Sequence, residues 1–109
     1  MKMINKRVGI IAVAASLICL PSAWAEDKID PAKGRDLAFT MCGQCHAIGA
    51  DDTSTAPEAP AFRDLQKLYP VESLEEALGE GIVTGHPDMP EVALEPDMIN
   101  NFIAYLKTL

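Results

Sequence analysis

Four segments of the chain carry hydrophobic residues at the spacing of an α-helix. These segments are residues 31–45, 61–69, 73–85 and 97–107. Side chains that recur three or four positions apart share one helical face. The shared faces comprise Gly34, Leu37, Ala38 and Met41; Phe62, Leu65 and Tyr69; Leu74, Ala77, Leu78 and Ile82; and Ile99, Phe102, Ile103 and Leu106. Because no stretch has a strand pattern of useful length and no segment is repeated, the pattern predicts an all-α domain of about four short helices.

Capping signals mark where two of these helices begin. Asp30 followed by Pro31 suits an N-cap and a first helical position, and Ser73 with Glu76 has the spacing of a capping box. Gly34 lies inside the first segment, where glycine costs about 1 kcal/mol relative to alanine. We therefore expect another helix to approach closely there, with Tyr105 of the last segment able to pack over the glycine.

The first 25 residues have the pattern of a secretory signal peptide. Basic residues are followed by an apolar run over residues 8–20, and residues 23–25 form an A-x-A cleavage site. The basic residues are Lys2, Lys6 and Arg7. Because the run is shorter than the ~20 residues of a membrane-spanning helix, we expect cleavage after Ala25, export to the periplasm and no stable membrane insertion. An uncleaved anchor is one alternative, and a lipoprotein processed at Cys19 is another.

The remaining residues, 26–109, form the predicted domain, and their charge is strongly acidic. They keep all 16 acidic residues but lose three of the nine basic ones of the whole chain, whose net charge is already −7. Such a chain is a poor candidate for binding nucleic acid. We expect it to be steered towards partner proteins that have basic docking patches.

The segment from Cys42 to His46 reads C-x-x-C-H, the spacing for covalent attachment of a c-type haem. Two thiols three residues apart lie on one side of a helical turn, where each can add to one vinyl group of the porphyrin edge. Histidine is the usual proximal ligand of the iron. A redox dithiol and half of a zinc site are alternatives, but the sequence has neither a βαβ pattern nor a second C-x-x-C. A structural disulfide is a third alternative, although so short a loop adds little stability.

The ligands on the two sides of the iron can be sought along the rest of the chain. The carbonyl of Pro57 or Pro60, in the polar loop at 47–60, could accept a hydrogen bond from His46. For the opposite side we assign Met89, in a stiff segment with three prolines at 86–96 that is long enough to wrap the ring. The other candidates are Met98, the rival imidazole of His86, and Met41, which is tethered to the proximal side.

These motifs together resemble the small monohaem class I cytochromes c of bacteria, over nearly the whole predicted domain. The residues that carry the resemblance are Gly34, Leu37, Ala38, Cys42-Gly43-Gln44-Cys45-His46-Ala47-Ile48-Gly49, Ala59-Pro60-Ala61-Phe62, Gly85-His86-Pro87-Asp88-Met89-Pro90 and Ile103-Ala104-Tyr105-Leu106. The resemblance implies one covalent haem c on Cys42 and Cys45, with His46 and Met89 as axial ligands. It also implies that Pro60 supports His46 and that Tyr105 packs near Gly34. The family often has an aromatic residue where this chain has Ala38, with Phe39 one position later.

We therefore expect a monomeric, soluble electron carrier of the periplasm that is not an enzyme, because an iron with both axial positions filled can only change valence. It would pass single electrons between redox proteins. Two other functions stay open. The domain could be a subunit docked permanently to a dehydrogenase or an oxidase, or a haem protein with an open sixth position that binds small ligands.

Overall fold

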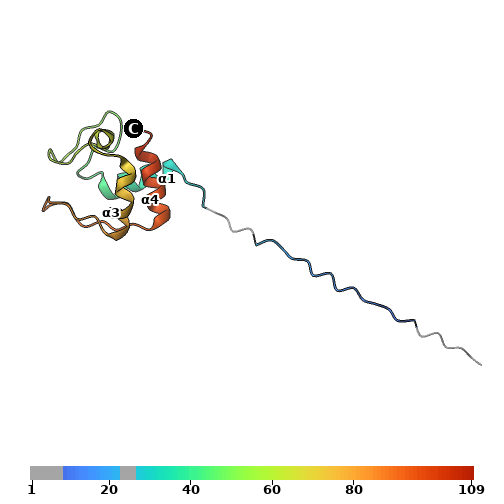
Figure 1. Cartoon of the computed structure of the whole chain (residues 1–109). Coiled ribbons are helices and arrows are strands. Elements are labelled where there is room, and N and C mark those ends of the chain that lie inside the picture. The colour runs from blue at the N-terminus through green and yellow to red at the C-terminus, as the bar shows by residue number, and fades with distance from the viewer. Residues whose placement is uncertain (1–8, 23–26) are drawn as a thin grey trace, which may run out of the picture.

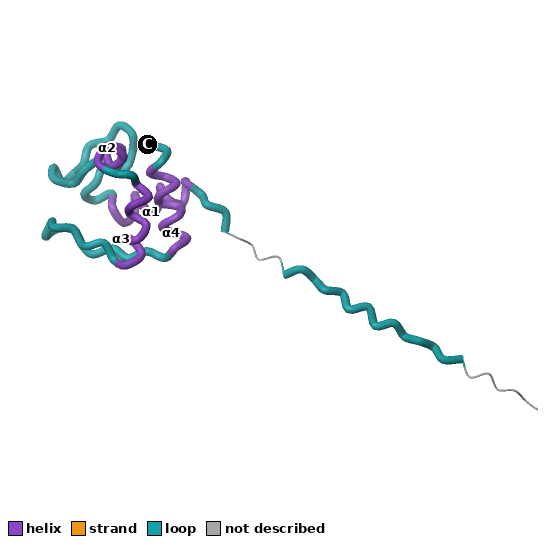
Figure 2. Tube along the Cα trace, in the orientation of Figure 1, coloured by secondary structure: helices purple, strands orange, loops and turns teal. Residues whose placement is uncertain are grey.

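The structure is a computed structural model that describes residues 9–22 and 27–109. Within these ranges it is helical and contains no strand, which confirms the all-α prediction (Figures 1 and 2). The α-helices are α1 (Pro31–Cys42), α2 (Leu65–Leu68), α3 (Leu74–Glu80) and α4 (Pro96–Leu106), with 3-10 turns at Phe62–Asp64 and Val71–Ser73.

Helices α1 and α4 pack against each other and form the centre of the core. A Cβ atom added to Gly34 would lie 2.5 Å from the carbonyl carbon of Asn101 and closer still to its oxygen. The close approach predicted at Gly34 is therefore confirmed. Its nearest neighbours are backbone atoms of Asn101 and Phe102. The packing of Tyr105 near Gly34 stays a prediction.

The buried face of α4 matches the sequence pattern. Ile99, Phe102, Ile103 and Leu106 are each at most 7% exposed. On α1, Ala38 is fully buried whereas Phe39 is 71% exposed. The small residue thus occupies the helix interface, and the aromatic ring one position later points away from it.

Helix α1 begins as predicted but ends earlier than expected. The side chain of Asp30 accepts a hydrogen bond from the Ala32 amide at 2.9 Å, which confirms the N-cap. The last helical residue is Cys42, not residue 45. The amides of Cys45 and His46 both donate to the Cys42 carbonyl, at 3.2 and 2.9 Å, so the chain turns back directly after the first cysteine.

The middle of the chain is less helical than its hydrophobic pattern suggests. Phe62 and Leu65 are buried as expected, but Tyr69 is 37% exposed and the helix ends at Leu68. The capping box is also wrong, because Ser73 has helical backbone angles and its hydroxyl donates to the Pro70 carbonyl at 2.7 Å. The serine side chain is therefore used in the 3-10 turn that precedes α3.

An extended segment follows α3 and folds back on itself. Gly81 ends the helix with φ = +102°, a backbone conformation that side-chain-bearing residues rarely adopt. Ile82 and Val92 form an isolated antiparallel bridge, and the Leu94 amide donates to the Leu78 carbonyl at 2.8 Å. These contacts join the two ends of the loop that contains Met89 and fasten it to α3.

Residues 9–22 form no helix, and their apolar side chains contact little of the chain. The large apolar residues of this segment are 79–92% exposed. None of the helices found in the described residues is long and apolar enough to cross a membrane. The basic residues at positions 2–7 and the proposed cleavage site at Ala25 lie outside the described residues.

Candidate functional site

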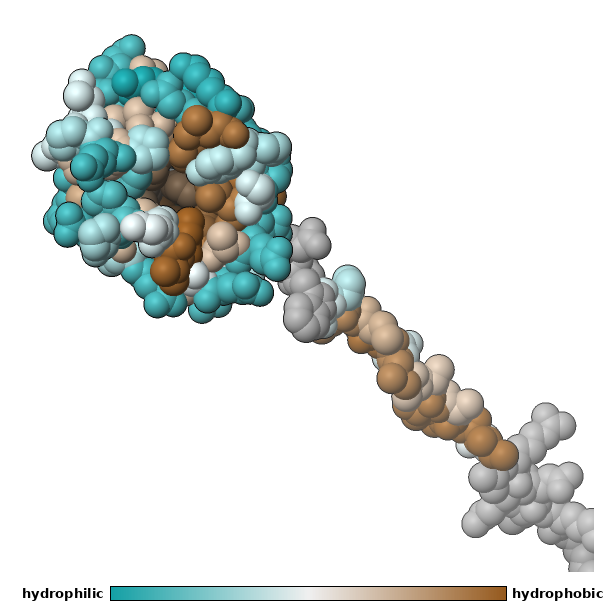
Figure 3. Space-filling model, turned by 60° about the vertical axis from the view of Figure 1, so that its left-hand side comes forward, coloured by the Kyte–Doolittle hydropathy of each residue, from teal (hydrophilic) through white to brown (hydrophobic). Residues whose placement is uncertain are grey.

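An apolar cleft opens between α1, α3, α4 and the segment from Ile82 to Leu94. The space between its walls, including the open mouth, is about 560 Å³. Figure 3 shows a hollow bordered by hydrophobic side chains and surrounded by hydrophilic ones. The lining residues that carry nitrogen or sulfur are Met41, Cys42, His46 and Met89. The others are Leu37, Phe62, Leu74, Leu78, Ile82, Val92, Leu94 and Phe102.

The two cysteines of the C-x-x-C-H motif lie in different surroundings. Cys42 lines the cleft at the end of α1, and its burial raises the pKa of its thiol. Cys45 is exposed and does not line the cleft. Both are free thiols, as is Cys19. The structure therefore brings Cys42 and His46 together at one site and leaves Cys45 in the turn at its edge.

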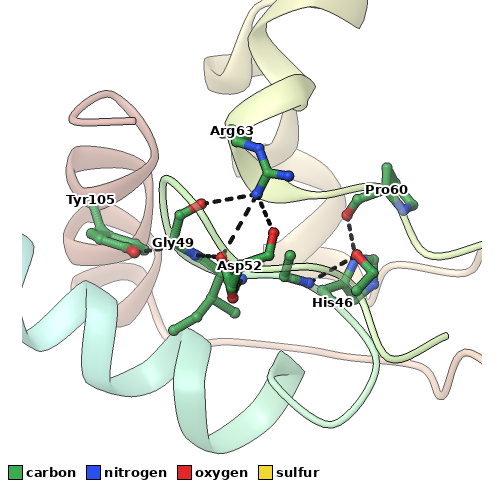
Figure 4. A network of polar contacts seen from close by, with 9 residues as sticks. His46, Gly49, Asp52, Pro60, Arg63 and Tyr105 are labelled. Carbon is green, nitrogen blue, oxygen red and sulfur yellow. Dashed lines mark hydrogen bonds and ion pairs between the residues drawn. The ribbon is translucent and has the colours of Figure 1, made fainter. Parts of the chain in front are cut away.

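His46 is oriented by two neighbours. The Pro60 carbonyl lies 2.7 Å from Nδ1 (Figure 4), so the possible role of this proline in supporting His46 is confirmed. Since a carbonyl can only accept, Nδ1 carries the proton and the lone pair is on Nε2. The imidazole also packs on Phe62, with ring centroids 5.0 Å apart and planes tilted by 34°. This tautomer is the one that allows Nε2 to bind a metal.

The loop after His46 is held by a polar network that the sequence analysis missed. The Asp52 carboxylate accepts the amides of Ile48 and Gly49, at 3.0 and 2.9 Å. Arg63 donates to the carbonyls of Asp52 and Gly49, at 2.7 and 3.4 Å (Figure 4). The buried Tyr105 hydroxyl donates to the Ile48 carbonyl at 2.5 Å. Aspartate is common in turns because its side chain bonds nearby backbone groups, whereas Arg63 and Tyr105 had no local signal.

The Asp52 carboxyl also has a shifted pKa. Desolvation by itself would raise this pKa, but the hydrogen bonds from Gly49 and Ile48 and the charge of Arg63 together lower it below the usual value. The carboxylate is therefore the form that the loop stabilises.

Of the methionines proposed for the distal side, only Met89 lies in the cleft on the far segment of the chain. Its amide donates to the His86 carbonyl at 3.2 Å, which closes the turn that presents the side chain. Met98 is 39% exposed and lines a separate surface groove with Asp97 and Asn101. Met41 also lines the cleft, but it is attached to α1 directly before Cys42.

His86, the rival ligand, is engaged elsewhere. It does not line the cleft, and its Nε2 forms an ion pair with the Glu58 carboxylate. That hydrogen bond, helped by the charges of Glu58 and Asp88 and opposed by desolvation, raises the pKa of His86. The pair joins the loop that carries Pro60 to the loop that carries Met89.

Residues 9–22 and 27–109 contain no group of three or more His, Cys, Asp or Glu side chains arranged to bind a metal ion. A porphyrin supplies four ligands of its own iron, so a haem needs only axial ligands from the protein. In comparisons with known proteins, no family model, no curated protein and no solved structure matches this chain.

Proposed function

We propose that the chain is a monohaem c-type cytochrome with a class I fold, which carries single electrons between redox proteins in the periplasm. The observation that supports this most directly is the cleft, because it places Cys42, His46 and Met89 in one apolar site. The sequence supplies the C-x-x-C-H spacing independently of the fold.

The lining of the cleft suits a haem. Its walls are leucine, isoleucine, valine and phenylalanine side chains, which match the apolar faces of a porphyrin. Imidazole and thioether are the axial ligand pair of many electron-transfer haems. When bound, the haem would supply an Fe(III)/Fe(II) couple.

Four residues of the chain would hold the haem. Cys42 and Cys45 would attach the porphyrin edge through thioether bonds, and the Nε2 atom of His46 would bind one side of the iron. Met89 would bind the other side, where a soft thioether favours the reduced metal. With the haem bound, the apolar walls would keep water from its buried faces, so little reorganisation would accompany a change of charge.

The acidic side chains indicate the partner. Residues 68–106 contain no lysine or arginine, and their acidic residues are all exposed. These are Glu72, Glu75, Glu76, Glu80, Asp88, Glu91, Glu95 and Asp97. They lie in the 3-10 turn Val71–Ser73, on α3, on the Met89 loop and at the start of α4, and α3, the Met89 loop and α4 also supply lining residues of the cleft. We infer a redox partner with a basic patch, whose association rate would fall as salt is added.

The periplasmic location rests on the sequence pattern of the first 25 residues. The apolar side chains of residues 9–22 are exposed, as expected of a segment that serves export and not the folded domain. Mass spectrometry of the protein purified from periplasm would show a chain that begins at Glu26. A chain that retains residues 1–25 would favour an anchor, and one lipidated at Cys19 a lipoprotein.

Optical spectroscopy tests the function with matched variants. The oxidised protein should show the weak far-red band of methionine–iron ligation, and Met89→Ala should lose it while Met98→Ala keeps it. The reduced protein should not bind carbon monoxide at neutral pH. Binding of carbon monoxide by the unmodified protein would favour the open-iron alternative, and co-elution with an enzyme in native extract would favour a permanent subunit.

A further inference from the structure

The three residues that follow His46 have every backbone hydrogen-bonding group occupied. The Ala47 amide donates to the Ser54 hydroxyl at 2.9 Å, and its carbonyl accepts from the Phe62 amide at 2.9 Å. The amides of Ile48 and Gly49 both bind the Asp52 carboxylate. Their carbonyls accept from the Tyr105 hydroxyl and from Arg63, respectively. Irregular backbone with such complete bonding has little freedom to rotate.

The partners of this segment come from distant parts of the chain. Tyr105 lies on α4, 57 residues away from Ile48. Arg63 lies three residues after Pro60, in the segment whose Phe62 amide binds Ala47. These contacts join the loop after His46 to the segment that contains Pro60. They therefore set the position of the Pro60 carbonyl relative to Nδ1 of His46.

We propose that Asp52, Arg63 and Tyr105 are positioning residues that fix the rotational setting of the His46 ring. This inference rests on the proposed function, because the ring setting matters most when Nε2 binds iron. They act through the peptide groups of residues 47–49 and through the Pro60 carbonyl, and they do not touch the metal. The protein thereby controls the ring plane and the basicity of the ligand from outside the cleft.

The alternative is that Asp52, Arg63 and Tyr105 only stabilise the fold. The hydrogen bonds of these side chains distinguish that role from a positioning role. Tyr105 is only 7% exposed, and its hydroxyl donates to the carbonyl of Ile48 in the loop. Arg63 directs one nitrogen at two loop carbonyls, although the Asp52 carboxylate is 3.7 Å from the same atom. A residue that served stability through an ion pair alone would direct its donors at the carboxylate. The hydrogen bonds of Tyr105 and Arg63 instead fix the orientation of the loop peptide groups whose carbonyls they bind.

The chain offers a matched control for each substitution. Tyr105→Phe is compared with Tyr69→Phe, which removes a hydroxyl from a half-exposed ring outside the network. Asp52→Asn is compared with the same change at its exposed neighbour Asp51. Arg63→Gln is compared with Lys67→Gln, whose ammonium pairs with Asp64 and not with the loop.

Proton NMR of the haem-loaded ferric protein provides the measurement, because the hyperfine shifts of the haem methyl groups report the orientation of the axial ligands, and the substitutions lie on the side of His46 and not of Met89. We expect each network variant to change the order or the spread of these shifts, and each control to leave them unchanged. Exchange of the His46 Nδ1 proton should become about tenfold faster, the effect of losing roughly one hydrogen bond. Arg63→Lys, which keeps one donor, should restore part of the original pattern.

The outcomes are distinguishable. Network variants that unfold more readily but keep the original methyl shifts and proton exchange would overturn the inference and leave a stabilising role. Variants that shift together with their controls would overturn it as well. Failure of the unmodified chain to carry haem, or loss of its far-red band in Met98→Ala instead of Met89→Ala, would contradict the proposed function and not the network.

Discussion

The crossing of α1 and α4 makes Gly34→Ala the most informative single substitution for the fold. The added Cβ atom would lie 2.5 Å from the Asn101 carbonyl carbon and 2.9 Å from the Phe102 amide nitrogen. These are backbone atoms of a buried helix, so no side-chain rotation relieves the overlap. The two helices would have to separate by about 1 Å to reach the usual contact distance of ~3.5 Å.

Two opposing effects set the size of the change. Alanine is favoured over glycine inside a helix by about 1 kcal/mol. Overpacking of a core commonly costs about 1–3 kcal/mol, and rigid backbone atoms on one side place this case at or above the upper end. We therefore expect Gly34→Ala to lower the free energy of unfolding by about 2 kcal/mol or more.

Gly79→Ala on α3 is the matched control. Its added Cβ would meet only the terminal methyl carbon of Ile99, at 3.6 Å, an ordinary contact. We expect it to raise the free energy of unfolding by up to about 1 kcal/mol. Urea unfolding of the haem-loaded protein, followed by circular dichroism, measures both variants. If Gly34→Ala proved as stable as the unmodified protein, the helices could not cross as described.

Three further predictions concern the core, the proximal loop and the cofactor. Phe102→Ala removes a buried ring that packs edge-to-face on Phe62, with centroids 5.6 Å apart. It should lower the free energy of unfolding in urea by about 3–5 kcal/mol. A loss smaller than that of the exposed control Phe39→Ala would contradict the packing. The pKa of Asp52 is lowered in the folded state, so its contribution to stability is present at neutral pH and is lost as the pH falls through the acid range. Asp52→Asn should therefore lose less stability on acidification than the unmodified protein. An acid profile that is unchanged, and equal to that of Asp51→Asn, would refute this. Burial of the porphyrin faces should contribute on the order of 10 kcal/mol to stability, which is comparable with the ~5–15 kcal/mol net free energy of unfolding of a whole domain. The chain without haem should therefore be largely unfolded. Native-like dispersion in the NMR spectrum of the haem-free chain would contradict this.

The sequence pattern predicted the features that depend on local chemistry. Asp30 caps α1 because a short acidic side chain precedes a proline, and the four apolar positions of α4 are buried because they share one face. The hydrogen bond from His46 to the Pro60 carbonyl needed only a loop of suitable length, although the sequence could not choose between the two prolines.

Features that depend on tertiary contacts escaped the pattern. The early end of α1 follows from the turn that brings His46 back beneath Cys42, and helix periodicity does not report it. Ser73 satisfies the capping-box spacing but bonds to Pro70, because a 3-10 turn occupies the place of a simple N-cap. The bond of Tyr105 to Ile48 spans 57 residues, and no local signal marks such a partner.

Covalent attachment of haem tests the account most directly. The chain should be produced in a bacterial host that carries the machinery for c-type cytochrome maturation, with a Cys42→Ser Cys45→Ser variant as the control. We predict a red protein whose mass, after denaturation and solvent extraction, exceeds that of the polypeptide by one haem, whereas the variant loses its colour on extraction. A colourless, haem-free product from the unmodified chain in that host would contradict the account.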